Sequence, residues 1–208
     1  MRDKILGIAS EQFSQYGVRA ITMEDIARLA GISKKTIYQE FKDKKQLVKD
    51  AFTKVLQEDQ YVLNKVMAGE DGVIEHLVYT SKIVRERFAN LNPMALLEIQ
   101  KYFPEVWKMF NEFKEEIIVT DIVGVIEKGK RLGYFRPEIN AKILANMRVD
   151  QISATMMSQS SANKEFSLLT LHLEMLDHFL HGIFTEKGRQ AYLQKQKSDK
   201  ITQGIETV

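Results

Sequence analysis

A short segment, residues 34–45, combines several lysines with uncharged polar and apolar side chains at helical spacing. In helical register, Ile37 and Phe41 fall on one side of the segment, and Lys35 and Gln39 point roughly the opposite way. Lysine and glutamine side chains can hydrogen-bond to base edges, and lysine ammonium groups also pair with phosphates. The segment therefore indicates a helix that packs through its apolar side and offers its polar side to a groove of DNA.

Eight residues in and before this segment are the candidates for DNA contacts. Gln39 and Lys35 are predicted to reach base edges, whereas Lys44 is predicted to meet a phosphate. The full set is Thr22, Ser33, Lys34, Lys35, Thr36, Tyr38, Gln39 and Lys44. The neighbouring Glu40 either accepts a hydrogen bond from a cytosine or lies in solvent at the edge of this face, where phosphates repel it. The second interpretation is favoured. A lysine-rich short helix can also be no more than solvated surface.

The four histidines and the lack of cysteine speak against metal or catalytic chemistry. None of the histidines has a glutamate three residues before it, and the sequence contains no His-Glu-x-x-His motif. His178 and His181 fall on a polar stripe, whereas His172 lies among leucines and is predicted to be a core or interface residue. Because a phosphate-binding glycine loop and a recognisable Ser/His/Asp set are also missing, the sequence predicts neither an enzyme nor a cofactor or metal site.

The elements that position the candidate DNA contacts follow from capping residues. Thr22 and Ser33 are predicted N-caps, because their hydroxyl groups can accept from the unpaired amides of the next helical turn. Gly31 ends the first of two short helices, and Asp43 caps a longer helix that runs to about residue 67. Two short helices joined by a tight turn with a glycine form the helix-turn-helix arrangement.

The rest of the sequence predicts an all-α protein. Three prolines and eleven glycines in 208 residues leave few helix breakers, and helical spacing recurs throughout. Further helices are expected at about 73–90, 94–102, 105–131, 139–160 and 165–186. We expect an N-terminal three-helix helix-turn-helix domain at 1–48 (the head), a helical ligand-binding and dimerisation domain at 49–194 (the body), and a polar, loosely ordered tail at 195–208.

The charge distribution and hydropathy of the sequence limit the partners that the protein can bind and the compartment in which it lies. Residues 1–55 carry eleven Lys and Arg against seven Asp and Glu, a charge of +4, whereas residues 56–208 carry nineteen against twenty-one, a charge of −2. Only the head is therefore expected to meet a polyanion. Asp3 and Glu11 do not fit a signal peptide, and the most apolar stretch, 117–126, is too short to span a bilayer. We expect a cytoplasmic protein without a membrane partner.

Residues 4–55 resemble the DNA-binding head of the tetracycline-repressor (TetR) family of bacterial transcription regulators. The matching residues are Thr22, Ile26-Ala27, Ala30-Gly31-Ile32-Ser33, Thr36-Ile37-Tyr38, Phe41, Lys44 and Leu47. Two weaker matches lie at 133–137 and 182–189. Lys35 stands where the family commonly has a small residue, and Glu40 where it commonly has an aromatic, histidine or basic residue. The operator sequence therefore does not follow from the resemblance.

The helix expected at 165–186 has an apolar surface that is wider than packing on one neighbour requires. Its polar residues form one narrow stripe, which consists of Thr170, Glu174, Asp177, His178 and His181. The helix is therefore predicted to pack against its own body and a second subunit, or else to lie centrally in a monomer. The resemblance implies that the last two long helices of each subunit pair into a four-helix dimer interface. Its candidate residues are Leu168, His172, Met175, Leu176, Phe179 and Ile183.

Methionine and aromatic side chains gather in the middle of the chain. Such residues usually form a core, but methionine adapts its shape easily, so the same composition also lines ligand pockets. The resemblance implies a ligand cavity between the middle helices. Its candidate residues are Phe88, Met94, Leu97, Tyr102, Phe103, Trp107, Phe110, Met147 and Gln151.

These features together predict a homodimeric transcription regulator. The favoured form is a repressor that an apolar or amphipathic small-molecule inducer releases from a palindromic double-stranded DNA operator. Two alternatives stay open. The protein is a helix-turn-helix regulator that a protein partner controls or that acts architecturally, or it is a helical carrier or enzyme whose basic head is incidental.

Overall fold

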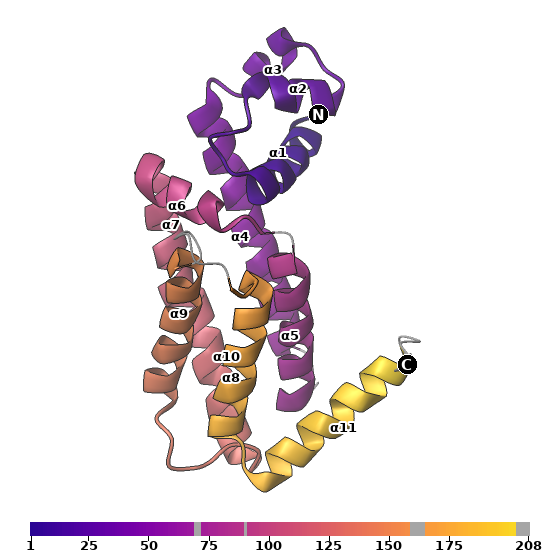
Figure 1. Cartoon of the computed structure of the whole chain (residues 1–208), viewed down its shortest axis with the longest axis vertical. Helices are drawn as coiled ribbons and strands as arrows, with labels where there is room; N and C mark the ends of the chain where they lie inside the picture. The colour runs from indigo at the N-terminus through magenta and orange to yellow at the C-terminus, as the bar shows by residue number, and fades with distance from the viewer. Residues whose placement is uncertain (69–71, 90, 159–164, 203–208) are drawn as a thin grey trace. The chain divides into compact units, whose positions relative to one another are not determined.

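The computed structural model describes residues 1–68, 72–89, 91–158 and 165–202, which form helices joined by short connections (Figure 1). The predicted all-α fold is confirmed, because the only extended pairing within these residues is an isolated bridge between Phe135 and Phe184. No helix in the described ranges is both long and apolar enough to cross a membrane. The chain divides into two compact units.

The first unit contains the head and two helices from the middle of the chain, and it covers residues 1–62, 90–115 and 156–164. Its helices are α1 (Arg2–Tyr16), α2 (Met23–Ala30), α3 (Lys34–Glu40), most of α4 (Lys44–Ala68), α6 (Pro93–Tyr102) and α7 (Pro104–Phe113). Ile99 of α6 and Val106 of α7 are buried in the same apolar cluster as Ile5, Ile26 and Leu47 of the head. The sequence-based boundary at residue 48 would assign α6 and α7 to the body, whereas their contacts assign them to the unit of the head.

Capping fixes the two short helices of the head as the sequence predicts. The hydroxyl of Thr22 accepts from the amide of Asp25 at 3.1 Å, and the Asp25 carboxylate accepts from the Thr22 amide at 3.0 Å. The hydroxyl of Ser33 accepts from the amide of Thr36 at 3.1 Å. Gly31 adopts the left-handed conformation with φ 70°, which a glycine allows without strain. The orientation of α3 against α2 therefore follows from local hydrogen bonds and one glycine.

The second unit covers residues 63–89, 116–155 and 165–208. Its helices are α5 (Val73–Ala89), α8 (Val119–Arg131), α9 (Ala141–Ser158), α10 (Leu168–Ile183) and α11 (Glu186–Thr202). The helix predicted at 105–131 is continuous, but a π-helical turn at Lys114–Ile118 separates α7 from α8. The helix predicted at 165–186 ends at Ile183. The helix that follows, α11, extends to Thr202, beyond the residue at which the polar composition indicates a loose tail.

Two glycines allow close packing around the α8–α9 connection: Gly129 lets Phe135 pack onto α8, and Gly188 lets the start of α11 approach Tyr134. A Cβ on Gly188 would lie 2.0 Å from the carbonyl oxygen of Tyr134, and a Cβ on Gly129 would lie 2.2 Å from the ring of Phe135. The Tyr134 carbonyl also accepts from the amide of Thr185 at 2.9 Å. The two segments with weaker sequence matches, 133–137 and 182–189, therefore meet in one contact that requires Gly188.

Candidate nucleic-acid interface

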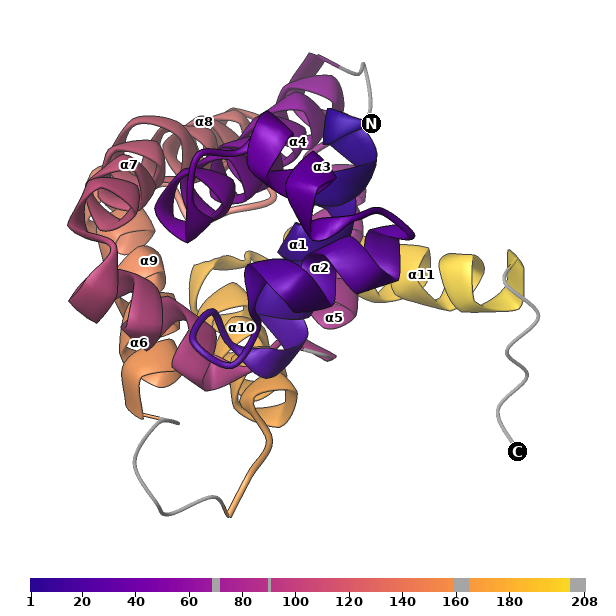
Figure 2. The ribbon, with the colours of Figure 1, turned by 90° about the horizontal axis from the view of Figure 1, so that it is seen from above.

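The recognition face consists of the outward side of α3, which lies beside α2 and the start of α4 (Figure 2). Ile37 and Phe41 are fully buried in the core of the head. Lys35 and Gln39 are exposed on the other side of the helix. The sequence-based orientation of α3 is therefore confirmed, and two hydrogen-bonding side chains are presented to solvent where a base edge could meet them.

Three of the other candidates already have partners within the head. The hydroxyls of Thr22 and Ser33 are used in the caps of α2 and α3, so both residues position the helices. The Lys34 ammonium lies 3.2 Å from the Glu24 carboxylate, and both side chains are exposed, so a phosphate would have to replace that carboxylate. Thr36 is half-buried beside Ser33, and Tyr38 is exposed.

Lys44 occupies a more enclosed position than the sequence suggests. Its ammonium donates to the carbonyl oxygen of Arg19 at 3.3 Å, and partial burial lowers the pKa of Lys44 from its ordinary value of 10.5. Lys42 and Lys45, on either side of it along the chain, are exposed. Lys44 therefore connects the start of α4 to the loop before α2, and its contact with a phosphate stays a prediction.

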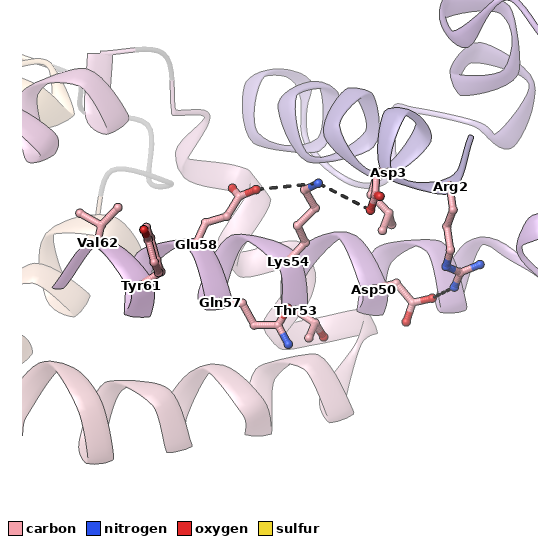
Figure 3. A pocket seen from close by; sticks show the side chains of 10 residues that line it. Arg2, Asp3, Asp50, Thr53, Lys54, Gln57, Glu58, Tyr61 and Val62 are labelled. Carbon is pink, nitrogen blue, oxygen red and sulfur yellow. Dashed lines mark hydrogen bonds and ion pairs between the residues drawn. The ribbon is translucent and has the colours of Figure 1, made fainter. Parts of the chain in front are cut away.

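Arg2 joins α1 to both α3 and α4, which sequence reasoning missed. Its guanidinium lies 4.2 Å over the ring centroid of Phe41 and donates to the Glu40 carbonyl oxygen. It also forms a 2.6 Å ion pair with Asp50 of α4 (Figure 3). The partners of Arg2 are about forty residues or more away along the chain, so no local pattern reveals them. The Glu40 carboxylate lies 4.0 Å from Arg2, on the side of α3 that meets α1.

A cavity of about 650 Å³ lies next to Arg2, between α1 and α4 (Figure 3). Its charged side chains pair with one another. Besides the pair between Arg2 and Asp50, Lys54 lies 3.9 Å from both Asp3 and Glu58. These ion pairs hold α1 onto α4.

Helices α6 and α7 are attached to the head by polar contacts as well as by the shared core. Glu98 of α6 accepts from the amide of Arg19 at 2.8 Å, and the Arg19 guanidinium lies 4.9 Å over the ring of Tyr102. Lys49 of α4 forms a 3.3 Å ion pair with Glu105 of α7. A displacement of α6 would therefore strain the loop that precedes α2, and a displacement of α7 would disturb its contact with α4.

Comparisons with known proteins agree with this geometry. The family described as bacterial regulatory proteins, tetR family, matches residues 5–51. The uncharacterized HTH-type transcriptional regulator YhgD of Bacillus subtilis is 32% identical over 137 residues, which is 65% of this chain and 65% of YhgD. The chain thus matches just under two thirds of the length of that relative. The HTH-type transcriptional repressor KstR2 of Rhodococcus jostii is 28% identical over 160 residues, 68% of this chain and 71% of KstR2.

Residues 5–51 therefore match the DNA-binding domain of the TetR family of transcriptional regulators. A solved structure supports the fold over nearly the whole length. A transcriptional regulator from Saccharomonospora viridis, crystallised in complex with choline, has 19% identity and a TM-score of 0.68, and the alignment covers 89% of this chain and 98% of that one. The relatives are transcriptional regulators, and the recognition face described above is the part of the chain that the family match includes.

The pocket candidates are divided between the two units. Those in the first unit are Met94, Leu97, Tyr102, Phe103, Trp107 and Phe110, and those in the second are Met147 and Gln151; the side chain of Phe88 lies outside the described residues. Phe103 and Trp107 pack against the core of the head, and Phe110 makes an edge-on contact with Phe52 of α4, with 6.1 Å between the ring centroids. Met94, Tyr102 and Met147 are exposed.

The candidates for the dimer interface are largely enclosed by their own subunit. Leu168, His172, Phe179 and Ile183 are buried, and Met175 and Leu176 are half-buried. The polar stripe of α10 is exposed, as predicted. On α9, by contrast, Ile143 is 64% exposed and Met147 is 43% exposed, one helical turn apart on the same face. These two side chains offer apolar surface that the described residues of the subunit leave open.

The second unit also contains several buried polar and ionisable side chains. The His76 imidazole lies 3.3 Å from the Asp121 carboxylate, and both side chains are almost fully enclosed. Arg148 of α9 and His172 of α10 are also buried. Arg148 lies on the apolar face of α9, about one turn after Ala145 and two turns after Ala141, a register position that would have revealed it in the sequence. No group of three or more His, Asp or Glu side chains within the described ranges is arranged to hold a metal ion.

Proposed function

We propose that the protein is a homodimeric, cytoplasmic repressor without enzyme activity that binds a palindromic operator and leaves it when an apolar or amphipathic small molecule binds the body. The observation that carries this proposal is the orientation of α3, with Ile37 buried and Lys35 and Gln39 exposed. KstR2 is named a transcriptional repressor, which supports a protein that lowers transcription. The choline complex of the regulator from Saccharomonospora viridis supports a small-molecule effector.

Two-fold symmetry connects the dimer to the form of the operator. A symmetric dimer presents two copies of α3, and these can read equivalent sequences only if the half-sites are inverted repeats. Their centres should be about one helical turn, ~34 Å, or a multiple of that distance apart. An effector that changes the separation of the two helices would then weaken specific binding, because the duplex fixes the spacing of the half-sites.

The experiment is a titration of the DNA upstream of its own gene by fluorescence anisotropy, with unrelated DNA of the same length in parallel. Wild-type protein should prefer the upstream DNA, and Gln39→Ala should reduce that preference. Gln100→Ala, the same change at an exposed position of α6, is the matched control and should bind like wild type. Equal affinity of wild type for both DNAs at moderate salt would contradict the proposal.

A further inference from the structure

Arg148 is a buried cation that forms no ion pair with any described residue. Its residue is 4% exposed, and in the described part of the chain no carboxylate lies within ion-pair distance of its guanidinium. Its hydrogen-bond partner is the side-chain oxygen of Gln151, at 3.5 Å, the upper limit for such a bond. A guanidinium has five N–H donors, and a buried charge without a partner is costly. Burial accordingly lowers the pKa of Arg148 to about 10.

The described residues near Arg148 supply polar side chains. Gln151 and Thr155 follow it on α9 at spacings of three and seven residues, which places the three side chains along one side of the helix. His172 of α10 is fully buried near Arg148, and burial together with that positive charge lowers its pKa to about 4. His172 is therefore neutral at pH 7 and adds no second cation.

We propose that Arg148 binds the anionic end of the effector and that the effector is a monocarboxylate with an apolar remainder. This inference rests on the proposed function, in which the body binds a small molecule. The planar guanidinium and a carboxylate match in a two-bond geometry. Arg148 is the one buried Lys or Arg of the described residues, so one negative charge balances the site. A dianion such as a phosphate monoester would leave uncompensated charge in the interior.

The proposal is tested with four probes that share a ten-carbon chain and differ in the head group: decanoate, decanol, decyl phosphate and decyltrimethylammonium. Binding to the full chain is measured by isothermal titration calorimetry below the micellar range. Decanoate should bind at least tenfold more tightly than decanol or decyl phosphate, and the cationic probe should bind most weakly. Equal affinities for decanoate and decanol, or no binding of any probe, would overturn the proposal.

Arg148→Met removes the charge and keeps most of the side-chain length, and Lys142→Met makes the same kind of change at an exposed position of α9. Arg148→Met should lose the preference for decanoate over decanol, whereas Lys142→Met should keep it. Without any probe, Arg148→Met should melt no lower than wild type, because it removes an uncompensated buried charge. A melting temperature several degrees lower would mean that an internal partner already balances Arg148, and would overturn the proposal.

Operator binding is measured on the same samples, so that a failure of the Arg148 proposal can be distinguished from a failure of the proposed function. If decanoate binds through Arg148 but does not change operator affinity, the ligand class is supported and the release mechanism of the proposed function is wrong. If operator affinity falls equally with decanol and decanoate, release is supported and the role of Arg148 is wrong.

Discussion

Gln39 and Lys44 illustrate how two polar residues a few positions apart can differ in their expected effect on DNA binding. Gln39 is exposed on the outward face of α3, so Gln39→Ala should cost about 1–3 kcal/mol at one base pair and relax the sequence preference there. Lys44→Ala should weaken binding to all sequences and reduce the slope of log affinity against log salt by about one. Both are measured as affinities for operator variants at several salt concentrations. A change of base preference in Lys44→Ala but not in Gln39→Ala would contradict the orientation of α3.

His172 should make the folding stability depend on pH below neutrality. Its pKa is about 4 in the folded protein and about 6.5 in an unfolded chain, so the unfolded state binds more protons between these values. Stability should therefore be complete above pH 6.5 and should fall by about 3 kcal/mol as the pH drops toward 4. The measurement is urea unfolding between pH 4 and pH 7.5. His172→Gln should flatten this dependence, whereas His178→Gln, at an exposed position, should not.

The junction between α8–α9 and α10–α11 gives a prediction for whole elements. Gly188→Ala should destabilise the second unit by more than about 2 kcal/mol, because the new methyl group would meet the Tyr134 backbone and the backbone cannot move aside as a side chain could. Gly182→Ala is the control, because nothing lies within 4 Å of the corresponding Cβ. That variant should be neutral or slightly stabilising. The thermal unfolding of Gly188→Ala is compared with that of Gly182→Ala. Equal melting temperatures of the two variants would contradict the role of the junction.

The helices and turns could be predicted from the sequence better than the contacts between them could. Thr22, Ser33 and Gly31 act within four residues of their partners, so the sequence contains the whole reason for α2, α3 and their turn. The positions of Arg2 beside Asp50 and of Gly188 beside Tyr134 depend on residues far apart in the chain, and no periodicity encodes them. For the same reason α6 and α7, which the family resemblance implies as cavity walls, contribute to the core of the head.

At the scale of the whole molecule, we expect the exposed apolar residues of α9 to take part in the proposed dimer interface. Ile143→Asp should weaken self-association by about 2 kcal/mol, roughly thirtyfold, because it replaces buried apolar contact with a charge. Sedimentation velocity over a range of concentrations measures this. Gln194→Asp, which adds the same charge at an exposed position of α11, should leave association unchanged. If Ile143→Asp associates like wild type, the interface lies elsewhere.

The π-helical turn at Lys114–Ile118 also affects how the chain tolerates changes in length. A π turn accommodates one residue more than the α-helical pattern that surrounds it. Deleting Glu115 would let the backbone close into a regular α-helix, and the residues on either side would keep their faces, so Val106 would stay in the core of the head and Ile126 in the core of the second unit. Deleting a residue from the regular part of α8 would instead rotate all residues on one side of the deletion by about 100° about the helix axis. The π turn therefore makes this segment the place in the α7–α8 helix where the chain should best tolerate the loss of one residue.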